Sequence, residues 1–283
     1  MTLRAQAAIV GIGEIPTQRA YPGRTTLSLM AEAAHLALED AGLRKEDVNG
    51  VITNVPAVSP LTLAEYLQLR VVFAEGASVQ GASGAHSIAI ASAAIHAGLA
   101  DTVLCVLGGV RNPDPGTPSA GTARSVGSEW EAPYGPGTAA TGRYAMLKRR
   151  HMFEFGTTDE QFAKIAVDQR TNALKNPNAV FHSQPITVEE VVGSRYVNEP
   201  LHLLECVMPC GGAAAAIVTS AERATSFRNR PVYLLGAGGS ATTHDVLWQE
   251  PSVTTTPVAI SARRAFQMAG YGPRDMQFLE FYD

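Results

Sequence analysis

Three cysteines are the strongest potential nucleophiles in this chain of 283 residues, so their positions limit the chemistry available to it. Cys206 and Cys210 lie four residues apart, and no cluster of His or Cys beside them completes a metal site. Cys105 lies within an apolar run. Three unevenly spaced cysteines are too few for a disulfide framework. We expect no metal site and three cysteines packed in the core, the reactive-thiol alternative for Cys210 being the less favoured one.

Two further groups have side chains suited to binding a ligand. Lys148, Arg149 and Arg150 form a short basic run, which predicts either contacts to the phosphates of a ligand or a solvated helix face. His86 follows Ser83 and Gly84 at the start of an alanine-rich run. It is expected either to face a pocket or to pack against a partner subunit.

Composition excludes several classes of protein. The net charge of -4 provides no basic field for nucleic acid. The first residues lack the apolar core of a signal peptide. No apolar run approaches the roughly 20 residues that a membrane helix requires. We therefore expect a cytoplasmic protein with one large or two ordinary domains.

The elements that would position these side chains alternate along the chain. Apolar runs bounded by Gly and Pro predict buried strands, and runs with helical spacing predict helices between them. The expected strands are 7–12, 47–54, 71–79, 102–107, 211–220, 232–236 and 276–281, and the expected helices are 27–41, 61–69, 83–99, 143–155, 158–175, 186–193, 222–224 and 259–269. Residues 111–141 are rich in Pro and Gly, which is typical of a functional excursion. This order predicts an α/β fold with mixed, mostly parallel sheets.

The two ends of the chain share a pattern. LALEDAGLRKEDVNGVIT and RAFQMAGYGPRDMQFLEF each read as a helix, Ala-Gly, a charged turn and a strand. We interpret them as equivalent parts of two similar βαβ-type halves.

Several strings resemble those of one family over nearly the whole chain. They include AAIVGIGEIP, HAGLADTVLCVLGG, GRYAMLKRRHMFEFGTTDEQFAKIAVDQRTNALKNPNA and SRYVNEPLHLLECVMPCGGAAAAIVTS. Together they resemble the thiolase superfamily, and within it the sterol-carrier-protein-type thiolases and bacterial lipid-transfer proteins. The resemblance implies a first half at 1–118 and 205–230, a loop region at 119–204, and the start of a second half at 231–283.

The family's nucleophilic cysteine has no counterpart here. Thiolases carry Cys-x-Ser-Gly at the N-terminus of a buried helix, where the helix dipole and amides stabilise a thiolate. The matching string in this chain is Gly81-Ala82-Ser83-Gly84. The resemblance therefore assigns Gly81, Ser83 and Gly84 to the nucleophile position and to the oxyanion site, and it excludes a covalent acyl-enzyme at Gly81.

A second family motif reads Tyr282-Asp283 in this chain. The resemblance makes Tyr282 the candidate acid/base, with Asp283 orienting a neighbour; the alternative for both is a structural role at a strand end. The Gly-His-Pro and Cys-x-Gly strings of thiolases are missing from these residues, so the second half is expected to be incomplete.

The activity implied by the resemblance follows from the absence of the nucleophilic cysteine. Some lipid-transfer members cleave a carbon–carbon bond by retro-aldol chemistry, which needs no cysteine. The implied substrate is a 3-hydroxyacyl-CoA, steroid- or lipid-derived, with His86, Lys148 and Arg149 binding it and no covalently bound cofactor. The alternatives are an acetyl-CoA acyltransferase-type thiolase, or a non-catalytic subunit of a complex with an OB-fold partner. A homodimer is also implied.

Overall fold

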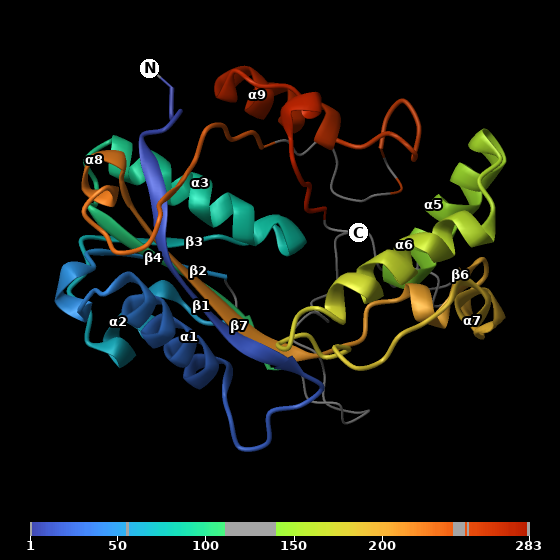
Figure 1. Cartoon of the computed structure of the whole chain (residues 1–283), viewed down its shortest axis with the longest axis horizontal. Coiled ribbons are helices and arrows are strands. Elements are labelled where there is room, and N and C mark those ends of the chain that lie inside the picture. Colours follow the sequence, from blue (N-terminus) through green and yellow to red (C-terminus); the bar gives the residue numbers. More distant parts are fainter. Residues whose placement is uncertain (1, 55–56, 111–139, 240–246, 248, 282–283) are drawn as a thin grey trace, which may run out of the picture. The chain divides into compact units, whose positions relative to one another are not determined.

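The computed structural model describes residues 2–54, 57–110, 140–239, 247 and 249–281 (Figure 1). These described residues group into two compact units. The first takes its residues from 1–110, 211–240 and 258–283, and the second from 111–210 and 241–257. The boundaries expected for the two halves and the loop region stay predictions.

The first unit is built on a six-stranded sheet with the described order β3-β2-β4-β7-β1-β8. Its elements are β1 (Ala7–Gln18), α1 (Thr26–Ala41), β2 (Gly50–Thr53), α2 (Pro60–Leu67), β3 (Phe73–Gly76), α3 (Ser83–His96), β4 (Thr102–Gly109), β7 (Gly211–Ser220), α8 (Ala221–Ala224), β8 (Val232–Tyr233) and α9 (Val258–Ala269). The sheet is mixed, as expected. Its strands β1 to β4 run in one direction, but three of its five described neighbour pairs are antiparallel because β7 and β8 run the other way.

Helices cover both faces of this sheet (Figure 1). Alternate residues of a strand point to opposite faces. Leu104 and Ile217 accordingly join the core cluster that contains α1 and α2. Cys105 and Val218 join the second cluster, which contains α3. The apolar runs in β4 and β7 are therefore explained by burial on both sides.

The structure confirms the internal duplication through matching close contacts. In the first half, a Cβ on Gly11 or Gly13 would collide with the backbone of α1 at Ala37 and Ala33. In the second half, Gly236 and Gly238 have the same relation to α9, where the contacts are to Ala265 and Ser261. The helix positions in the two halves differ by a constant 228 residues and the glycines by 225. Strand β1 and the segment that follows β8 thus each need two glycines so that the helix can approach.

The C-terminal ends of α1 and α9 are also stabilised in the same way, each by an arginine from another segment. Gly42 and Gly270 end α1 and α9 with the same left-handed φ of 70°. Arg228, just before β8, donates to the carbonyl of Asp40 at 2.7 Å at the end of α1. Arg4, just before β1, donates to the carbonyl of Ala269 at 2.8 Å at the end of α9. A cation at a helix C-terminus is favourable, so the two arginines stabilise the equivalent ends of α1 and α9.

Most expected strands differ from their predicted extents by a few residues, and two differ most. β1 continues to Gln18 because it pairs with β7 along its length, with an irregular register between Ile15 and Gln18 that accommodates Pro16. Residues 276–281, expected as a strand, adopt no strand structure. A strand needs a hydrogen-bonded neighbour, and no described strand pairs with this segment.

The second unit contains α5 (Ala140–Phe155), α6 (Asp159–Ala173), α7 (Val188–Gly193) and the short strands β5 (Tyr196–Asn198) and β6 (Leu201–His202). Thr158 and Thr187 form capping boxes at the starts of α6 and α7, as their sequence positions predict. These helix starts are therefore determined locally.

The close approach of β1 to α1 gives a stability prediction. In Gly13→Ala the new Cβ would lie 2.6 Å from the amide nitrogen of Ala37, so strand and helix must separate. We expect a loss of about 1–3 kcal/mol in the free energy of unfolding, measured by urea denaturation. Gly193→Ala is the control, because no described atom lies within 4 Å of the place that its new methyl group would take. Equal midpoints for the two variants would refute the proposed packing.

Candidate functional site

The segment around Gly81 lies where strands and helix favour a ligand site. Strands β2, β3 and β4 are parallel, and α3 starts shortly after the carboxyl end of β3. Ligands of α/β proteins bind outside the carboxyl ends of parallel strands. A 3₁₀ turn (Gln80–Ala82) connects β3 to α3 and places Gly81 on the surface. Gln80 has a φ of 53°, a left-handed conformation that is unfavourable for a residue with a side chain.

Ser83 fixes this turn. Its buried Oγ accepts the N–H of Val79 at 3.0 Å and donates to the carbonyl of Gln80 at 2.7 Å. The hydroxyl is thereby committed to backbone partners and is not poised as a nucleophile. Ser83 has a positioning role: it holds the conformation that presents Gly81.

The N-terminus of α3 presents backbone donors. The first N–H groups of a helix have no partner within the helix, and the helix dipole makes this end attractive to negative charge. No described side chain caps α3. No described atom lies within 4 Å of the position that a Cβ on Gly84 would take. The N–H groups of Ala82 and Ser83 already donate to the carbonyls of Val79 and Gln80, so the backbone open to a ligand is that at Gly84. His86 lies exposed on the same first turn.

Asn54 lies at the carboxyl end of β2, and it was not among the site residues predicted from the sequence. It follows β2, and its side-chain amide donates to the carbonyl of Gly108 at 3.1 Å and accepts the N–H of Gly108 at 3.0 Å. It therefore ties together the ends of β2 and β4. The offset of 228 residues pairs Asn54 with Tyr282, which are the residues that directly follow the two repeated strings. Tyr282 and Asp283 themselves lie outside the described residues.

Lys148 has a different role from the one expected. Its side chain, 4% exposed, bonds both carboxylate oxygens of Glu205 at 2.7 and 2.8 Å. It also lies 2.9 Å from Asp159 and donates to the carbonyl of Pro200 at 2.9 Å. The ammonium is buried and fully engaged within the second unit, which speaks against its predicted contact with a substrate phosphate. Arg149 is exposed and pairs with Glu199 on the surface.

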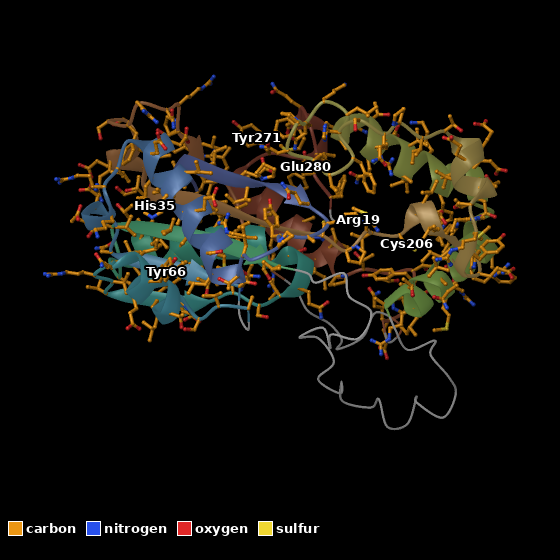
Figure 2. The ribbon with its side chains drawn as sticks, turned by 90° about the horizontal axis from the view of Figure 1, so that it is seen from below. Arg19, His35, Tyr66, Cys206, Tyr271 and Glu280 are labelled. Atoms are coloured by element: carbon orange, nitrogen blue, oxygen red, sulfur yellow. The ribbon has the colours of Figure 1, made fainter. Side chains whose placement is uncertain are left out.

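The cysteines differ in exposure. Cys105 is 1% exposed, as expected, and burial raises the pKa of its thiol to about 12. Cys206 and Cys210 are only partly buried, contrary to the expected core positions, because they lie on the irregular segment between β6 and β7. Cys206, labelled in Figure 2, has a pKa raised by desolvation and then by the charge of Glu205.

These environments predict selective thiol chemistry. A thiol with a raised pKa stays protonated and unreactive until the pH approaches that pKa. We expect iodoacetamide at pH 8 to leave Cys105 unmodified in the folded protein and to modify it after denaturation. Peptide mapping by mass spectrometry measures this. Rapid modification of Cys105 in the folded protein would contradict its burial.

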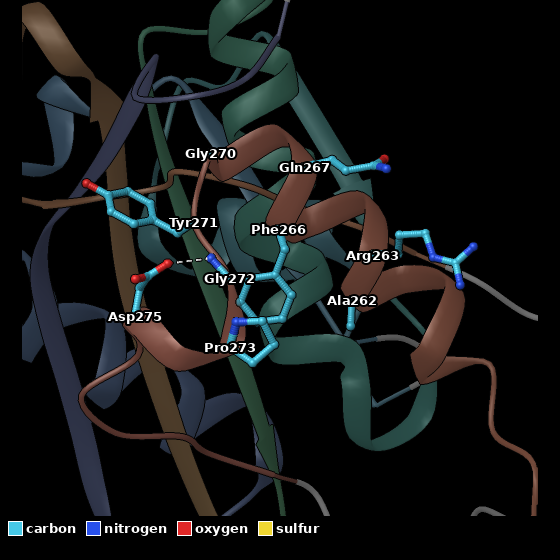
Figure 3. A pocket seen from close by; sticks show the side chains of 9 residues that line it. All are labelled: Ala262, Arg263, Phe266, Gln267, Gly270, Tyr271, Gly272, Pro273 and Asp275. Atoms are coloured by element: carbon cyan, nitrogen blue, oxygen red, sulfur yellow. Dashed lines mark hydrogen bonds between the residues drawn. The ribbon is translucent and has the colours of Figure 1, made fainter.

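Other site types find little support in the part of the chain that the structure describes. No three His, Cys, Asp or Glu residues there gather as a metal site. No described helix is both long and apolar enough to cross a membrane. Gly81 lines neither of two surface hollows, one on α9 (Figure 3) and the other on α5.

Comparison with known families and curated proteins gives one family. Residues 239–283 match the family described as thiolase C-terminal domain-like. The chain is 32% identical over 297 aligned residues to a steroid side-chain-cleaving aldolase of Thermomonospora curvata, covering 99% of this chain and 75% of that protein. It is also 32% identical to the 17-hydroxy-3-oxo-4-pregnene-20-carboxyl-CoA lyase of Mycobacterium tuberculosis, covering 99% of this chain and 76% of the relative.

Solved structures agree with these matches. The Ltp2-ChsH2(DUF35) aldolase superposes with a TM-score of 0.87 at 31% identity, over 96% of this chain and 72% of that one. The monomeric SCP2-thiolase like protein type 1 of Mycobacterium smegmatis superposes with a TM-score of 0.74 at 21% identity, over 96% of this chain and 58% of that one. The second likeness supports the fold alone.

Proposed function

The chain belongs to the thiolase superfamily, in the group of sterol-carrier-protein-type and lipid-transfer proteins, and on that premise we propose that it cleaves a carbon–carbon bond of a 3-hydroxyacyl-CoA by retro-aldol chemistry. Two relatives that align with 99% of the chain are a side-chain-cleaving aldolase and a carboxyl-CoA lyase. Their names support a substrate class of steroid- or lipid-derived CoA thioesters.

The observation that carries this proposal is the glycine at the nucleophile position. Gly81 lies on the turn before α3, where a thiolase needs its cysteine, and has no side chain to accept an acyl group. The neighbouring hydroxyl of Ser83 is engaged by the backbone of Val79 and Gln80. A site that keeps the amide donors but lacks a nucleophile suits a reaction through an enolate.

The reaction assigns one task to each part of the site. Tyr282, as the phenolate, removes the proton of the β-hydroxyl as general base, and the bond between Cα and Cβ breaks to give a ketone or aldehyde. The electron pair moves to the thioester as an enolate, whose oxygen is stabilised by N–H groups at Gly81 and at the start of α3. The proton held by Tyr282 then adds to Cα, directly or by exchange with solvent, which releases a shortened acyl-CoA and restores the phenolate, so atoms and charge balance. Asp283 orients Tyr282 in this scheme.

Binding of the CoA thioester is proposed for the remaining site residues. His86 is exposed one turn into α3 and faces solvent beside the amide donors. Arg149 has only a surface ion pair, which is worth little and exchanges readily for a phosphate. We propose no covalently bound cofactor, a cytoplasmic location and a homodimer.

A partner protein is part of the proposal. The solved aldolase that resembles this chain at a TM-score of 0.87 contains a DUF35 component, ChsH2. We infer a small OB-fold partner of that kind for this chain. A conventional acyltransferase is the second candidate, since an acetyl-CoA acetyltransferase of Methanothermobacter thermautotrophicus is 32% identical over 90% of this chain. Gly81 argues against it.

Product analysis tests the proposal. The chain, alone and with a DUF35-type partner, is incubated with a 3-hydroxyacyl-CoA and with the analogue that lacks the β-hydroxyl. We expect a carbonyl product and a shortened acyl-CoA from the first substrate only. Cleavage of neither substrate under either condition would refute a lyase function and leave the role of a non-catalytic subunit.

A further inference from the structure

A carboxylate near the end of α5 holds a segment that lies far away in the sequence. Glu154 accepts the hydroxyl of Thr254 on its Oε2 at 2.7 Å and the hydroxyl of Ser252 on its Oε1 at 3.3 Å. The Nε of Arg150 donates to the same Oε1 at 2.6 Å. We call these four residues the Glu154 clasp. It joins α5 to residues that follow it by about 100 positions.

The helix alone gives no reason for a carboxylate at this position. Glu154 lies in the last turn of α5, where the negative end of the helix dipole disfavours an anion. Its ion pair with Arg150 has the acid four residues after the base, which is the less favourable order along a helix. The side chain of Glu154 is nevertheless only 21% exposed. An anion in such a place needs hydrogen-bond donors, and Ser252 and Thr254 supply two of them.

The clasped residues form a compact turn. The N–H of Thr254 donates to the hydroxyl of Ser252 at 3.3 Å, and the N–H of Thr255 donates to the carbonyl of Ser252 at 2.9 Å. The turn presents its two hydroxyls to Glu154, so an ionised carboxylate is the partner that satisfies both. Hydrogen bonds from Thr254 and then from Arg150 lower the pKa of the Glu154 carboxyl, which keeps it ionised at neutral pH.

The clasped turn belongs to a segment that leaves the first unit and returns to it. Residues 241–257 group with the second unit, whereas the chain before and after them groups with the first. We call residues 249–257 the strap. The strap leads directly into α9. Helix α9 packs closely on Gly236 and Gly238, and Arg4 bonds to its C-terminal end. The strap is the chain that enters its N-terminal end.

We propose that Glu154 is a positioning residue for the reaction. Its carboxylate fastens the strap to α5, and the fastened strap fixes the point at which the chain enters α9 and continues to Tyr282. This role rests on the retro-aldol function proposed above, in which Tyr282 is the base. A loosened strap misplaces that base, and a misplacement of about 1 Å caused by a change far from the chemistry lowers a rate strongly.

Four variants of the full chain separate the hydroxyl, the charge and the shape. Thr254→Val keeps the shape of threonine but removes the hydroxyl, whereas Thr254→Ser keeps the hydroxyl. Glu154→Gln keeps the shape of the acid but leaves one acceptor oxygen for three donors. Thr171→Val is the control, because Thr171 is exposed and its hydroxyl donates within α6 to the carbonyl of Val167 at 2.8 Å. Far-UV circular dichroism confirms that the variants fold.

Amide hydrogen exchange without substrate tests the clasp itself. We expect the amides of Thr254 and Thr255 to exchange about tenfold faster or more in Thr254→Val and in Glu154→Gln, because the turn loses a hydrogen bond to a charged group. Thr254→Ser and Thr171→Val are expected to exchange as the wild type does. Unchanged exchange in both Thr254→Val and Glu154→Gln would overturn the proposal.

Steady-state cleavage of a 3-hydroxyacyl-CoA tests the positioning role. We expect kcat to fall about tenfold or more in Thr254→Val and in Glu154→Gln while KM changes little, and Thr254→Ser to retain the wild-type kcat. Faster exchange together with a wild-type kcat would overturn the positioning role, because the clasp would then serve stability alone. If the wild type itself cleaved no substrate, the proposed reaction and the positioning role would both fail. Exchange would still show whether the clasp exists.

Discussion

Replacing Tyr282 with phenylalanine is expected to lower kcat by about 10²- to 10⁴-fold while KM changes little. The phenolate oxygen is the proposed acceptor of the β-hydroxyl proton, and a positioned general base contributes about that much to a rate. Phenylalanine keeps the ring and removes only this oxygen. Steady-state cleavage of a 3-hydroxyacyl-CoA, with kcat and KM determined separately over pH, measures the effect.

The control for this experiment is Tyr66→Phe. Tyr66 lies on α2, and 58% of its surface is exposed. It is not part of the segment around Gly81, and the proposed reaction gives it no role. Its variant should cleave at the wild-type rate. Activity that persists in Tyr282→Phe, with the pH profile unchanged, would remove the role assigned to that hydroxyl.

Replacing Lys148 with methionine is expected to cost about 3–5 kcal/mol of folding free energy. Methionine retains the apolar stem but leaves the carboxylate of Glu205, 8% exposed, without its cation. Asp159, 26% exposed, loses the same partner and is partly compensated by water. The loss should also release α5 from the segment at Pro200. Chemical denaturation followed by far-UV circular dichroism measures the change.

Lys164→Met provides the matched comparison. Lys164 pairs with Asp168 one turn along α6, and both side chains are more than half exposed. Removing such a pair should cost well under about 1 kcal/mol. If the Lys148 and Lys164 variants lost similar free energy of unfolding, the buried ion pairs of Lys148 with Glu205 and Asp159 would not be a main source of stability in the second unit.

Features that depend on nearby residues could be predicted from the sequence. The start of α6 follows from Thr158 and Gln161, three positions apart, and the end of α1 follows from Gly42. Strand β7 was predicted to the residue, because a run of small apolar residues between two strands has few other ways to be buried. The thiolase-like α/β fold was predicted in the same way, from local strings.

Features that depend on distant partners could not be predicted. Residues 276–281 have the composition of a strand, but whether they form one depends on a neighbour outside the segment. Lys148 reads as one member of a basic run, and nothing nearby in sequence reveals that Glu205 and Asp159 enclose its ammonium. Asn54 gave no signal by itself. Its position became meaningful only when the repeat aligned it with Tyr282.

The most direct test of a lyase without an acyl-enzyme is cleavage in deuterium oxide with no free CoA added. An intact-mass spectrum of the protein is recorded during turnover, and the shortened acyl-CoA is analysed for deuterium. The account predicts cleavage without free CoA, one deuterium at the α-carbon of the product from protonation of the enolate, and an unmodified protein mass. Cleavage that occurs only after free CoA is added, with an acyl group carried on the protein, would contradict it.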